Sequence, residues 1–308
     1  MSPSSGVDGL VSVALCTFNG QQHLCAQLES VLNQRGVALE VVVCDDASDD
    51  DTWPLIEQWA ARDNRIRAWR HPHRLGINRN FELALSRCRG EFIALCDQDD
   101  VWDPVKLSTT LPLLNHHLLG YCDSQFVDEQ GNCLGMRLSQ RVNMYEGSGV
   151  LPLCFWNSVS GHAMVFRRTL LDHAMPFSES GYHDWWLAAV AATVGSIGYV
   201  DQALVQYRQH ALSQTDAMQR KAVKRNSWVL FRHRAAWLQR LAQVPGPDQP
   251  YLERLSHLWA AREHQWFCPA LVRHMRQRSD ELMQLNPREP FSRFALKQFW
   301  GQRWRRHA

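Results

Sequence analysis

The chain has 308 residues, of which 45% are hydrophobic and 21% charged, and these proportions are ordinary for a soluble globular protein. The length allows one large domain, or one domain with a helical appendage. The net charge of +2 conceals an asymmetry. Residues 217–308 contain 18 Lys or Arg against 6 Asp or Glu, so this segment carries +12 and the remaining residues carry −10. An acidic catalytic part and a basic tail are therefore expected.

The sequence contains no feature typical of export or membrane insertion. The first ten residues are small and polar, without the basic start and apolar core of a secretory signal. The longest uncharged stretch, residues 185–200, is shorter than the roughly 20 residues that a spanning helix needs. The nine cysteines form no C-x-x-C pair, and several end apolar runs, which favours a reducing compartment. These features predict a cytoplasmic protein that does not span the membrane.

Short apolar runs alternate with helical patterns over the first hundred residues. The apolar runs predict strands at residues 11–16, 39–44, 65–69 and 91–96. Helices are expected at residues 24–32, around Pro54, at 78–88, and from Asp103, as N-cap, and Pro104 through Leu114. This alternation predicts an α/β fold with a parallel sheet covered on both faces. Ligands of such sheets bind at the carboxyl ends of the strands.

The second half of the chain has a mixed pattern. Residues 121–127 and 133–135 flank a polar turn, which predicts a hairpin, and further strands are expected at 162–167 and 203–207. From about residue 218 the sequence becomes helical, basic and rich in tryptophan, with a break at residues 245–247 (Pro-Gly-Pro).

Acidic clusters follow two of the expected strands. Residues 97–100 (Asp-Gln-Asp-Asp) offer several oxygen ligands of the kind that Mg²⁺ or Mn²⁺ prefers. The alternative is a solvated loop before a helix N-terminus, and Asp103 is expected to serve only there. Asp45 and Asp46 end the second strand and are suited to receive the base or ribose of a nucleotide, although residues 48–52 could simply cap the next helix.

Two later motifs also carry titratable groups. In residues 183–186 (His-Asp-Trp-Trp), Asp184 lies beside two large aromatics, which suits a general base, and the tryptophans suit a sugar platform. The alternative is an N-capping aspartate with two core tryptophans. In residues 207–210 (Tyr-Arg-Gln-His), His210 is a candidate metal ligand and Arg208 a candidate diphosphate clamp, or His210 is a surface histidine.

These motifs together resemble the family 2 glycosyltransferases of GT-A fold. The resemblance rests on residues 16–19 (Cys-Thr-Phe-Asn), 45–49 (Asp-Asp-Ala-Ser-Asp), 76–80 (Gly-Ile-Asn-Arg-Asn) and 97–100. Residues 161–166 (Gly-His-Ala-Met-Val-Phe), 183–186 and 207–210 look like the rhamnosyltransferase-type branch of that family. The resemblance implies a GT-A domain at 9–215, with a donor half at about 9–118 and an acceptor half at about 119–215. Residues 216–308 would form a helical extension.

The resemblance also implies residue roles. Donor-binding residues would be Thr17, Phe18, Asn19, Asp46, Arg79 and Asp97. Asp97 and Asp99 match the D-x-D motif and would hold the metal, Mg²⁺ or Mn²⁺, with Asp99 expected as the direct ligand. His210 is the further candidate ligand from its own motif. Asp184 matches the catalytic base, and His183, Trp185 and Trp186 would meet the acceptor. Cys16 departs from the family, which usually has Pro or Thr there.

The expected activity is transfer of a sugar, with inversion, from a nucleotide-sugar donor to an acceptor hydroxyl. A deoxyhexose donor such as dTDP-rhamnose and a saccharide or lipid-linked saccharide acceptor in surface polysaccharide or glycolipid synthesis fit the resemblance. A sugar-phosphate nucleotidyltransferase is a second hypothesis, although residues 17–20 (Thr-Phe-Asn-Gly) lack the Gly-rich, basic loop typical of that class. A non-catalytic nucleotide-sugar-binding module is a third, and having both Asp99 and Asp184 argues against it.

The C-terminal tail interleaves aromatic residues with Lys and Arg, as interfacial segments do. Such a segment could dock on the inner face of a bacterial plasma membrane, where a lipid-linked acceptor would lie. The alternatives are packing on the catalytic domain or on a second subunit. No recognition motif accompanies the basic charge, so nucleic-acid binding is not expected.

Overall fold

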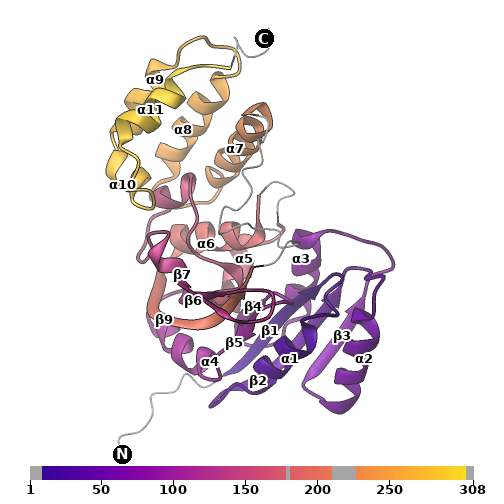
Figure 1. Ribbon diagram of the computed structural model, residues 1–308. Helices are drawn as coiled ribbons and strands as arrows, with labels where there is room; N and C mark the ends of the chain where they lie inside the picture. The colour runs from indigo at the N-terminus through magenta and orange to yellow at the C-terminus, as the bar shows by residue number, and fades with distance from the viewer. Residues whose placement is uncertain (1–8, 178–180, 210–226, 303–308) are drawn as a thin grey trace, which may run out of the picture.

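The computed structural model describes residues 9–177, 181–209 and 227–302 and shows an α/β unit with a helical unit at one end (Figure 1). Its sheet has the strand order β3-β2-β1-β4-β8-β6-β9-β5, with β7 paired to β6. The α/β class and the C-terminal helices predicted from the sequence are confirmed.

Parallel strands form the N-terminal half of the sheet. They are β1 (Leu10–Thr17), β2 (Ala38–Asp45), β3 (Ile66–Arg70) and β4 (Phe92–Cys96), and all their mutual pairings are parallel. The connecting helices are α1 (Leu24–Leu32), α2 (Thr52–Arg62) and α3 (Ile77–Arg87). The four strands lie within one or two residues of the predicted ranges.

Alternate residues of β1 enter two separate cores, which is the reason why these strands are apolar throughout. Val13 packs in the same core as Leu28 of α1 and Ile56 of α2. Ala14 packs in the opposite core with Phe81 of α3. Helices therefore cover both faces, and the polar loops are left at the carboxyl edge of the sheet.

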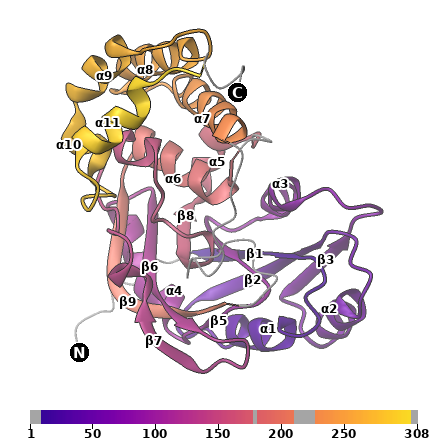
Figure 2. The same cartoon turned by 45° about the horizontal axis from the view of Figure 1, so that its top comes forward.

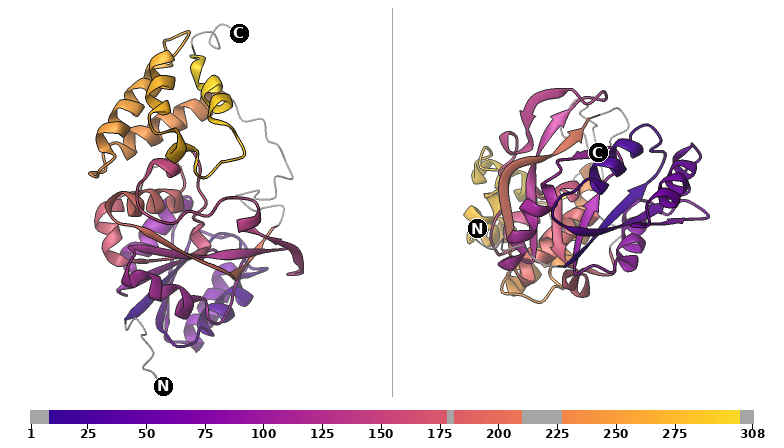
Figure 3. Two further views of the ribbon diagram at one scale, coloured as in Figure 1. Left: turned by 90° about the vertical axis from the view of Figure 1, so that its left-hand side faces the viewer. Right: turned by 90° about the horizontal axis from the view of Figure 1, so that it is seen from below.

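The second half of the sheet is mixed. Strand β8 (Met164–Arg167) lies antiparallel between β4 and β6 (Leu119–Val127), whereas β9 (Ile197–Arg208) runs parallel to β6. The predicted hairpin is present, because β7 (Cys133–Arg137) pairs antiparallel with β6. Figure 3 shows the curved sheet from below. The parallel arrangement thus extends without interruption only over β1 to β4.

The prediction of one α-helix from Asp103 to Leu114 is wrong in where the helix begins and in its length. Asp103 instead closes a turn by accepting from the backbone N–H of Val105 at 3.0 Å, and α4 spans only Lys106–Thr110. A 3₁₀ segment, Leu111–Asn115, follows it. Pro112 explains the change, because it has no N–H to continue the α-helical hydrogen bonding. The two-residue strand β5 (Val101–Trp102), which pairs with β9, was not predicted.

In the described part of the chain after residue 226, five helices form the helical unit (Figure 2). This unit packs on α6 (His183–Val194) and on a 3₁₀ turn, Leu151–Cys154, of the α/β unit. The five helices are α7 (Ser227–Leu241), α8 (Gln249–Ala261), α9 (Pro269–Arg276), α10 (Ser279–Met283) and α11 (Phe291–Phe299). One continuous hydrophobic core joins both units. The Pro-Gly-Pro break lies between α7 and α8, as predicted. Across the described residues, no helix is both long and apolar enough to cross a bilayer.

Candidate active site

The turn after β1 is fixed to the loop after β4 by one amide side chain. Gln98 Nε2 donates to the Phe18 carbonyl at 3.0 Å, and the Phe18 N–H donates to Gln98 Oε1 at 2.8 Å. A Cβ on Gly20 would lie 2.3 Å from Gln98 Oε1, so a larger residue there would displace the Gln98 amide that makes both hydrogen bonds. The predicted donor-binding turn and the acidic loop are therefore linked directly by hydrogen bonds.

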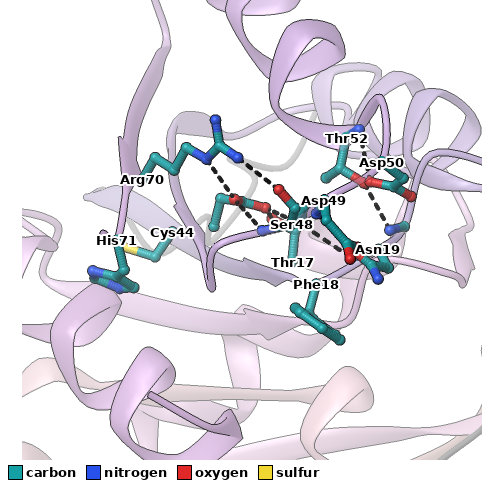
Figure 4. Close-up of polar contacts among 12 residues, drawn as sticks. Thr17, Phe18, Asn19, Cys44, Ser48, Asp49, Asp50, Thr52, Arg70 and His71 are labelled. Carbon is teal, nitrogen blue, oxygen red and sulfur yellow. Dashed lines mark hydrogen bonds and ion pairs between the residues drawn. The ribbon is translucent and has the colours of Figure 1, made fainter. Parts of the chain in front are cut away.

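The end of β2 supports the same turn (Figure 4). Thr17 Oγ1 donates to the buried Asp45 carboxylate at 2.8 Å, and the Ser48 N–H donates to its other oxygen at 3.0 Å. The Asn19 N–H donates to Ser48 Oγ at 2.9 Å. Asn19 itself has a positive φ of 50°, a conformation that asparagine tolerates better than most residues. Asp45 is thus an internal anchor of the loop.

Asp46 is buried and holds the loop that precedes α3. Its two carboxylate oxygens accept from the backbone N–H groups of Leu75 at 2.6 Å and Gly76 at 2.9 Å. The loop in turn places the Arg74 guanidinium 3.8 Å from the centre of the Phe18 ring. Two of the residues predicted to bind the donor, Phe18 and Asp46, therefore lie at this edge, and the Asp46 carboxylate already accepts hydrogen bonds from the backbone.

Helix α3 begins beside this loop. Arg79, predicted to bind the donor, lies in its first turn, is 56% exposed at the side chain, and pairs with Glu82. Asn78 links α3 to the start of α6, because its Oδ1 accepts from the His183 N–H at 3.2 Å and its Nδ2 donates to the Gly181 carbonyl at 2.8 Å. Helix α3 and helix α6, which carries the predicted base Asp184, are therefore linked by hydrogen bonds near their N-termini.

Three metal-ligating side chains converge at the end of β4. His162 Nδ1 lies 3.9 Å from Asp97 Oδ2 and 3.7 Å from Asp100 Oδ2. Among the residues that the structure describes, these three form the group whose ligand atoms all lie within 4.8 Å of one another. Asp97 is 39% exposed at the side chain, whereas Asp100 and His162 are buried. Asp99 is partly exposed and lies outside this group of three.

The concentration of negative charge shifts the titration of the cluster. Desolvation, together with the charges of Asp99 and Asp184, raises the pKa of Asp97 to about 7. Burial and the charges of Asp99 and Asp97 raise the pKa of Asp100 well above its usual range. Three carboxylates side by side are mutually destabilising, and a divalent cation relieves such repulsion.

Asp184 lies at the start of α6, close enough to raise the pKa of Asp97 through its charge. Its Oδ2 accepts from the Gly161 N–H at 3.3 Å and its Oδ1 from the Trp185 N–H at 2.7 Å. Desolvation raises the pKa of Asp184 to about 6, although these hydrogen bonds oppose the shift. A carboxylate with this pKa is ionised near neutral pH and more basic than an exposed one.

The neighbours of Asp184 differ in their accessibility. His183 is buried and stacks on Phe81 with ring centres 4.0 Å apart. Trp186 is 5% exposed and donates to the Ala174 carbonyl at 2.7 Å. Trp185 is only partly buried, and its Nε1 donates to the Leu153 carbonyl at 2.8 Å. Of the three residues predicted to contact the acceptor, Trp185 is the most exposed to solvent.

Arg208 contacts protein carbonyls on several sides. Its guanidinium donates to the backbone oxygens of Asp99 at 2.8 Å and Glu129 at 2.8 Å, and its own N–H donates to Asp100 Oδ1 at 3.0 Å. Arg208 therefore holds the acidic loop against the hairpin turn, a role that the sequence reasoning missed. The predicted ligand His210 lies outside the described residues.

His162 is the other residue that sequence reasoning missed. It was placed in a predicted strand, but the structure has residues 161–163 in a 3₁₀ turn directly before β8. A histidine in an otherwise apolar segment was the one available signal. Burial and the Lys106 ammonium lower the pKa of His162 to about 3, so the imidazole is neutral.

Comparison with known proteins agrees with this geometry. The curved sheet flanked by helices has the GT-A fold of the solved glycosyltransferase structures that it matches. The family model "Glycosyl transferase family 2" matches residues 12–175, which is more than half of the chain. The chain therefore belongs to glycosyl transferase family 2.

Two curated bacterial relatives illustrate the sequence similarity. The Mycobacterium tuberculosis protein Rv1520 is 29% identical over 209 residues, which cover 65% of this chain and 59% of that protein. The Escherichia coli protein named UDP-Glc:alpha-D-GlcNAc-diphosphoundecaprenol beta-1,3-glucosyltransferase WfaP is 26% identical over 223 residues, covering 72% of this chain and 85% of that protein. The chain thus spans less than two thirds of the mycobacterial relative.

Solved structures share the fold. Staphylococcus aureus TarS 1–349 in complex with UDP-GlcNAc matches with a TM-score of 0.59 and 16% identity, covering 88% of this chain and 81% of that one. The mannosyltransferase PcManGT from Pyrobaculum calidifontis, in complex with GDP-Man and Mn²⁺, matches with a TM-score of 0.53 and 19% identity. That match covers 96% of this chain and 86% of PcManGT.

Proposed function

We propose that the protein is an inverting, metal-dependent glycosyltransferase that moves a sugar from a nucleoside-diphosphate donor to an acceptor hydroxyl. The observation that carries the proposal is that residues 161 and 162 bridge Asp184, on α6, and Asp97, at the end of β4. The Gly161 N–H donates to Asp184 Oδ2 at 3.3 Å, and the His162 Nδ1 lies 3.9 Å from Asp97 Oδ2. A general base and a diphosphate-metal site must act on the same sugar from opposite sides, and this pair brings the two functions together.

The chemistry of the donor set at the end of β4 suits Mg²⁺ or Mn²⁺, since Asp97 and Asp99 offer carboxylate oxygens and Asp97 is exposed to a ligand. Such an ion, when bound, neutralises charge on the departing nucleoside diphosphate. We assign Asp97 and Asp99 to hold it, with His210 as a further ligand. Thr17, Phe18, Asn19, Asp46 and Arg79 would bind the donor.

Asp184 would take the proton from the acceptor hydroxyl as that oxygen attacks the anomeric carbon. Attack from the face opposite the leaving group inverts the configuration. The Gly161 and Trp185 N–H groups hold the carboxylate in place. Trp185, with His183 and Trp186 behind it, would receive the acceptor. Residues 9–215 would form the catalytic domain, and residues 216–308 an extension.

The donor that we propose is a deoxyhexose nucleotide such as dTDP-rhamnose, on the strength of motifs 161–166, 183–186 and 207–210. The names of WfaP, of the TarS complex and of the PcManGT complex carry glucose, N-acetylglucosamine and mannose. The test is therefore a panel of dTDP-rhamnose, UDP-glucose, UDP-N-acetylglucosamine and GDP-mannose. Hydrolysis and thermal stabilisation would be measured with and without Mn²⁺. Mn²⁺-dependent hydrolysis of dTDP-rhamnose above the others supports the proposal. Preference for another donor contradicts the sugar, and hydrolysis of none contradicts the activity.

We also propose that the acceptor is a lipid-linked saccharide and that the protein works at the inner face of the plasma membrane. Support comes from a set of large apolar side chains at the end of the helical unit, which we call the aromatic patch: Trp266, Phe267, Leu296 and Trp300, each 45–61% exposed. The segments are held together, because the Cys268 N–H donates to the Phe299 carbonyl at 2.7 Å. Basic residues of the C-terminal segment would add about 1 kcal/mol each at an anionic surface.

Vesicle binding tests the aromatic patch. Phe267→Ser with Leu296→Gln should abolish co-sedimentation with phosphatidylglycerol vesicles. Val229→Ser with Leu230→Gln, at exposed positions of α7, is the matched control and should not change it. Equal binding of both double variants contradicts membrane docking. Loss of self-association instead of vesicle binding would assign the patch to a second copy of the chain.

A further inference from the structure

Asp100 has one carboxylate oxygen that the fold does not use. Its Oδ1 accepts from the Arg208 N–H at 3.0 Å, but Oδ2 is fully buried and has no hydrogen-bond partner among the described residues. Burying a carboxylate oxygen without a hydrogen-bond partner costs more free energy than burying a neutral polar atom. We therefore expect a positively charged or proton-donating group to bind this oxygen. The nearest candidate group is the His162 imidazole, whose Nδ1 lies 3.7 Å away.

The ring of His162 is oriented by its surroundings. Its Nε2 lies 2.8 Å from Ser124 Oγ, and its face lies against Tyr207 with ring centres 4.3 Å apart. The backbone is held as well, since Lys106 Nζ donates to the His162 carbonyl at 2.8 Å. When Nε2 carries the proton and donates it to Ser124, the lone pair of Nδ1 faces Asp97 and Asp100. A hydrogen bond from the nitrogen that faces away from the metal is the usual way in which proteins orient a histidine ligand.

The spacing of the three groups also fits a metal. Nδ1 lies 3.7 and 3.9 Å from the two carboxylate oxygens, and ligand atoms about 2.1–2.2 Å from one ion lie roughly 3–4 Å apart. One of the three, Asp97, is partly exposed and can share the ion with a diphosphate.

We propose that His162 Nδ1 is a ligand of the divalent metal, and that Asp100 and His162 contact the ion beside Asp97, in addition to the ligands assigned above. This inference rests on the proposed metal-dependent function and adds a nitrogen ligand from before β8 to it. A nitrogen ligand favours Mn²⁺ or Co²⁺ over Mg²⁺, because Mg²⁺ prefers oxygen ligands throughout.

Pulsed electron paramagnetic resonance of Mn²⁺, recorded with UDP present, tests the inference directly. The full-length protein should show ¹⁴N coupling from an imidazole. His162→Ala should lose the part of this coupling that comes from His162, leaving at most that of His210, and should weaken Mn²⁺ binding by at least tenfold, while Mg²⁺ binding changes less. His210→Ala is the matched control, because it removes the other histidine assigned to the metal, and it should keep a ¹⁴N signal.

Ser124→Ala gives a second measurement, which does not require the protein to fold with alanine at the buried position 162. It leaves the ring in place but removes the partner of Nε2, and should weaken Mn²⁺ binding with a smaller loss of ¹⁴N coupling. Coupling that persists in His162→Ala and disappears in His210→Ala overturns the inference and leaves metal dependence intact. Absence of Mn²⁺ binding by the unmodified protein overturns metal dependence itself.

Discussion

Replacing Asp184 by Asn separates the base role from the structural role of this residue. The variant keeps the shape of the side chain, so the start of α6 should remain in place. Asparagine cannot accept the proton of the acceptor hydroxyl, and loss of a general base costs about 10²–10⁴-fold in rate. We expect kcat to fall by that factor, with donor affinity unchanged within about threefold.

The pH profile follows from the same carboxyl group. With a pKa of about 6 for Asp184, the ionised fraction falls about tenfold per pH unit below pH 6, and kcat should fall with it. The stability of the folded protein changes with pH in the opposite direction from kcat. A folded-state pKa above the unfolded value of 3.8 makes the folded protein more stable at low pH, and that stability is lost as the pH rises from about 4 to about 6.

The pKa of Asp184 is raised by about two units, which lowers the stability of the folded protein by on the order of 3 kcal/mol at pH 7. The Asn variant avoids this cost, but its amide leaves one of the two backbone N–H groups without an acceptor, which costs about 1–3 kcal/mol. The two terms offset each other, so the melting temperature should change by only a few degrees. Measurements would be initial rates from pH 5 to 9 and thermal unfolding at pH 7. Substantial turnover of the variant, or a profile without a limb near pH 6, would refute the base assignment.

Three further predictions concern the surroundings. Gly20→Ala should raise the donor KM by tenfold or more, because its Cβ would overlap Gln98; an unchanged KM would show that the loop adjusts freely. Trp186→Ala should lower the free energy of unfolding by about 3–5 kcal/mol in urea titrations, while Trp185→Ala should lower it less and act mainly on acceptor KM. Chelation with EDTA should abolish transfer, and Mn²⁺ should restore it; full activity in EDTA would contradict a metal-dependent reaction.

The parallel strands could be predicted closely because each is buried on both faces and therefore apolar from end to end. Helices and strands were predicted wrongly where a single residue or a very short element leaves no periodic pattern in the sequence. Pro112 converts the expected helix into a 3₁₀ segment, and β5 is too short to show a period of two. The antiparallel insertion of β8 depends on pairing between distant segments, which no local pattern encodes.

The position of candidate site residues could be predicted where polar residues directly follow a strand, as with Asp97 and Asp46. It was not predictable where a role depends on a partner far along the chain. His162 faces Asp100 from 62 positions away, a pairing set by the neighbouring strands β4 and β8. Arg208 has the charge of a diphosphate ligand, but the fold brings backbone carbonyls to its guanidinium.

The continuous core between the α/β unit and the C-terminal helices has a consequence for biosynthesis. The Cys154 carbonyl accepts from Trp237 Nε1, 83 residues later in the chain, and Phe155 contacts Phe294 with ring centres 5.1 Å apart. At about 5–20 residues per second, the ribosome needs roughly 4–17 s to supply even the first of these partners. During that time, the apolar surface at residues 151–156 is exposed on the nascent chain. A chain cut short before α11 keeps part of this surface exposed permanently, so such truncations should bind chaperones or aggregate.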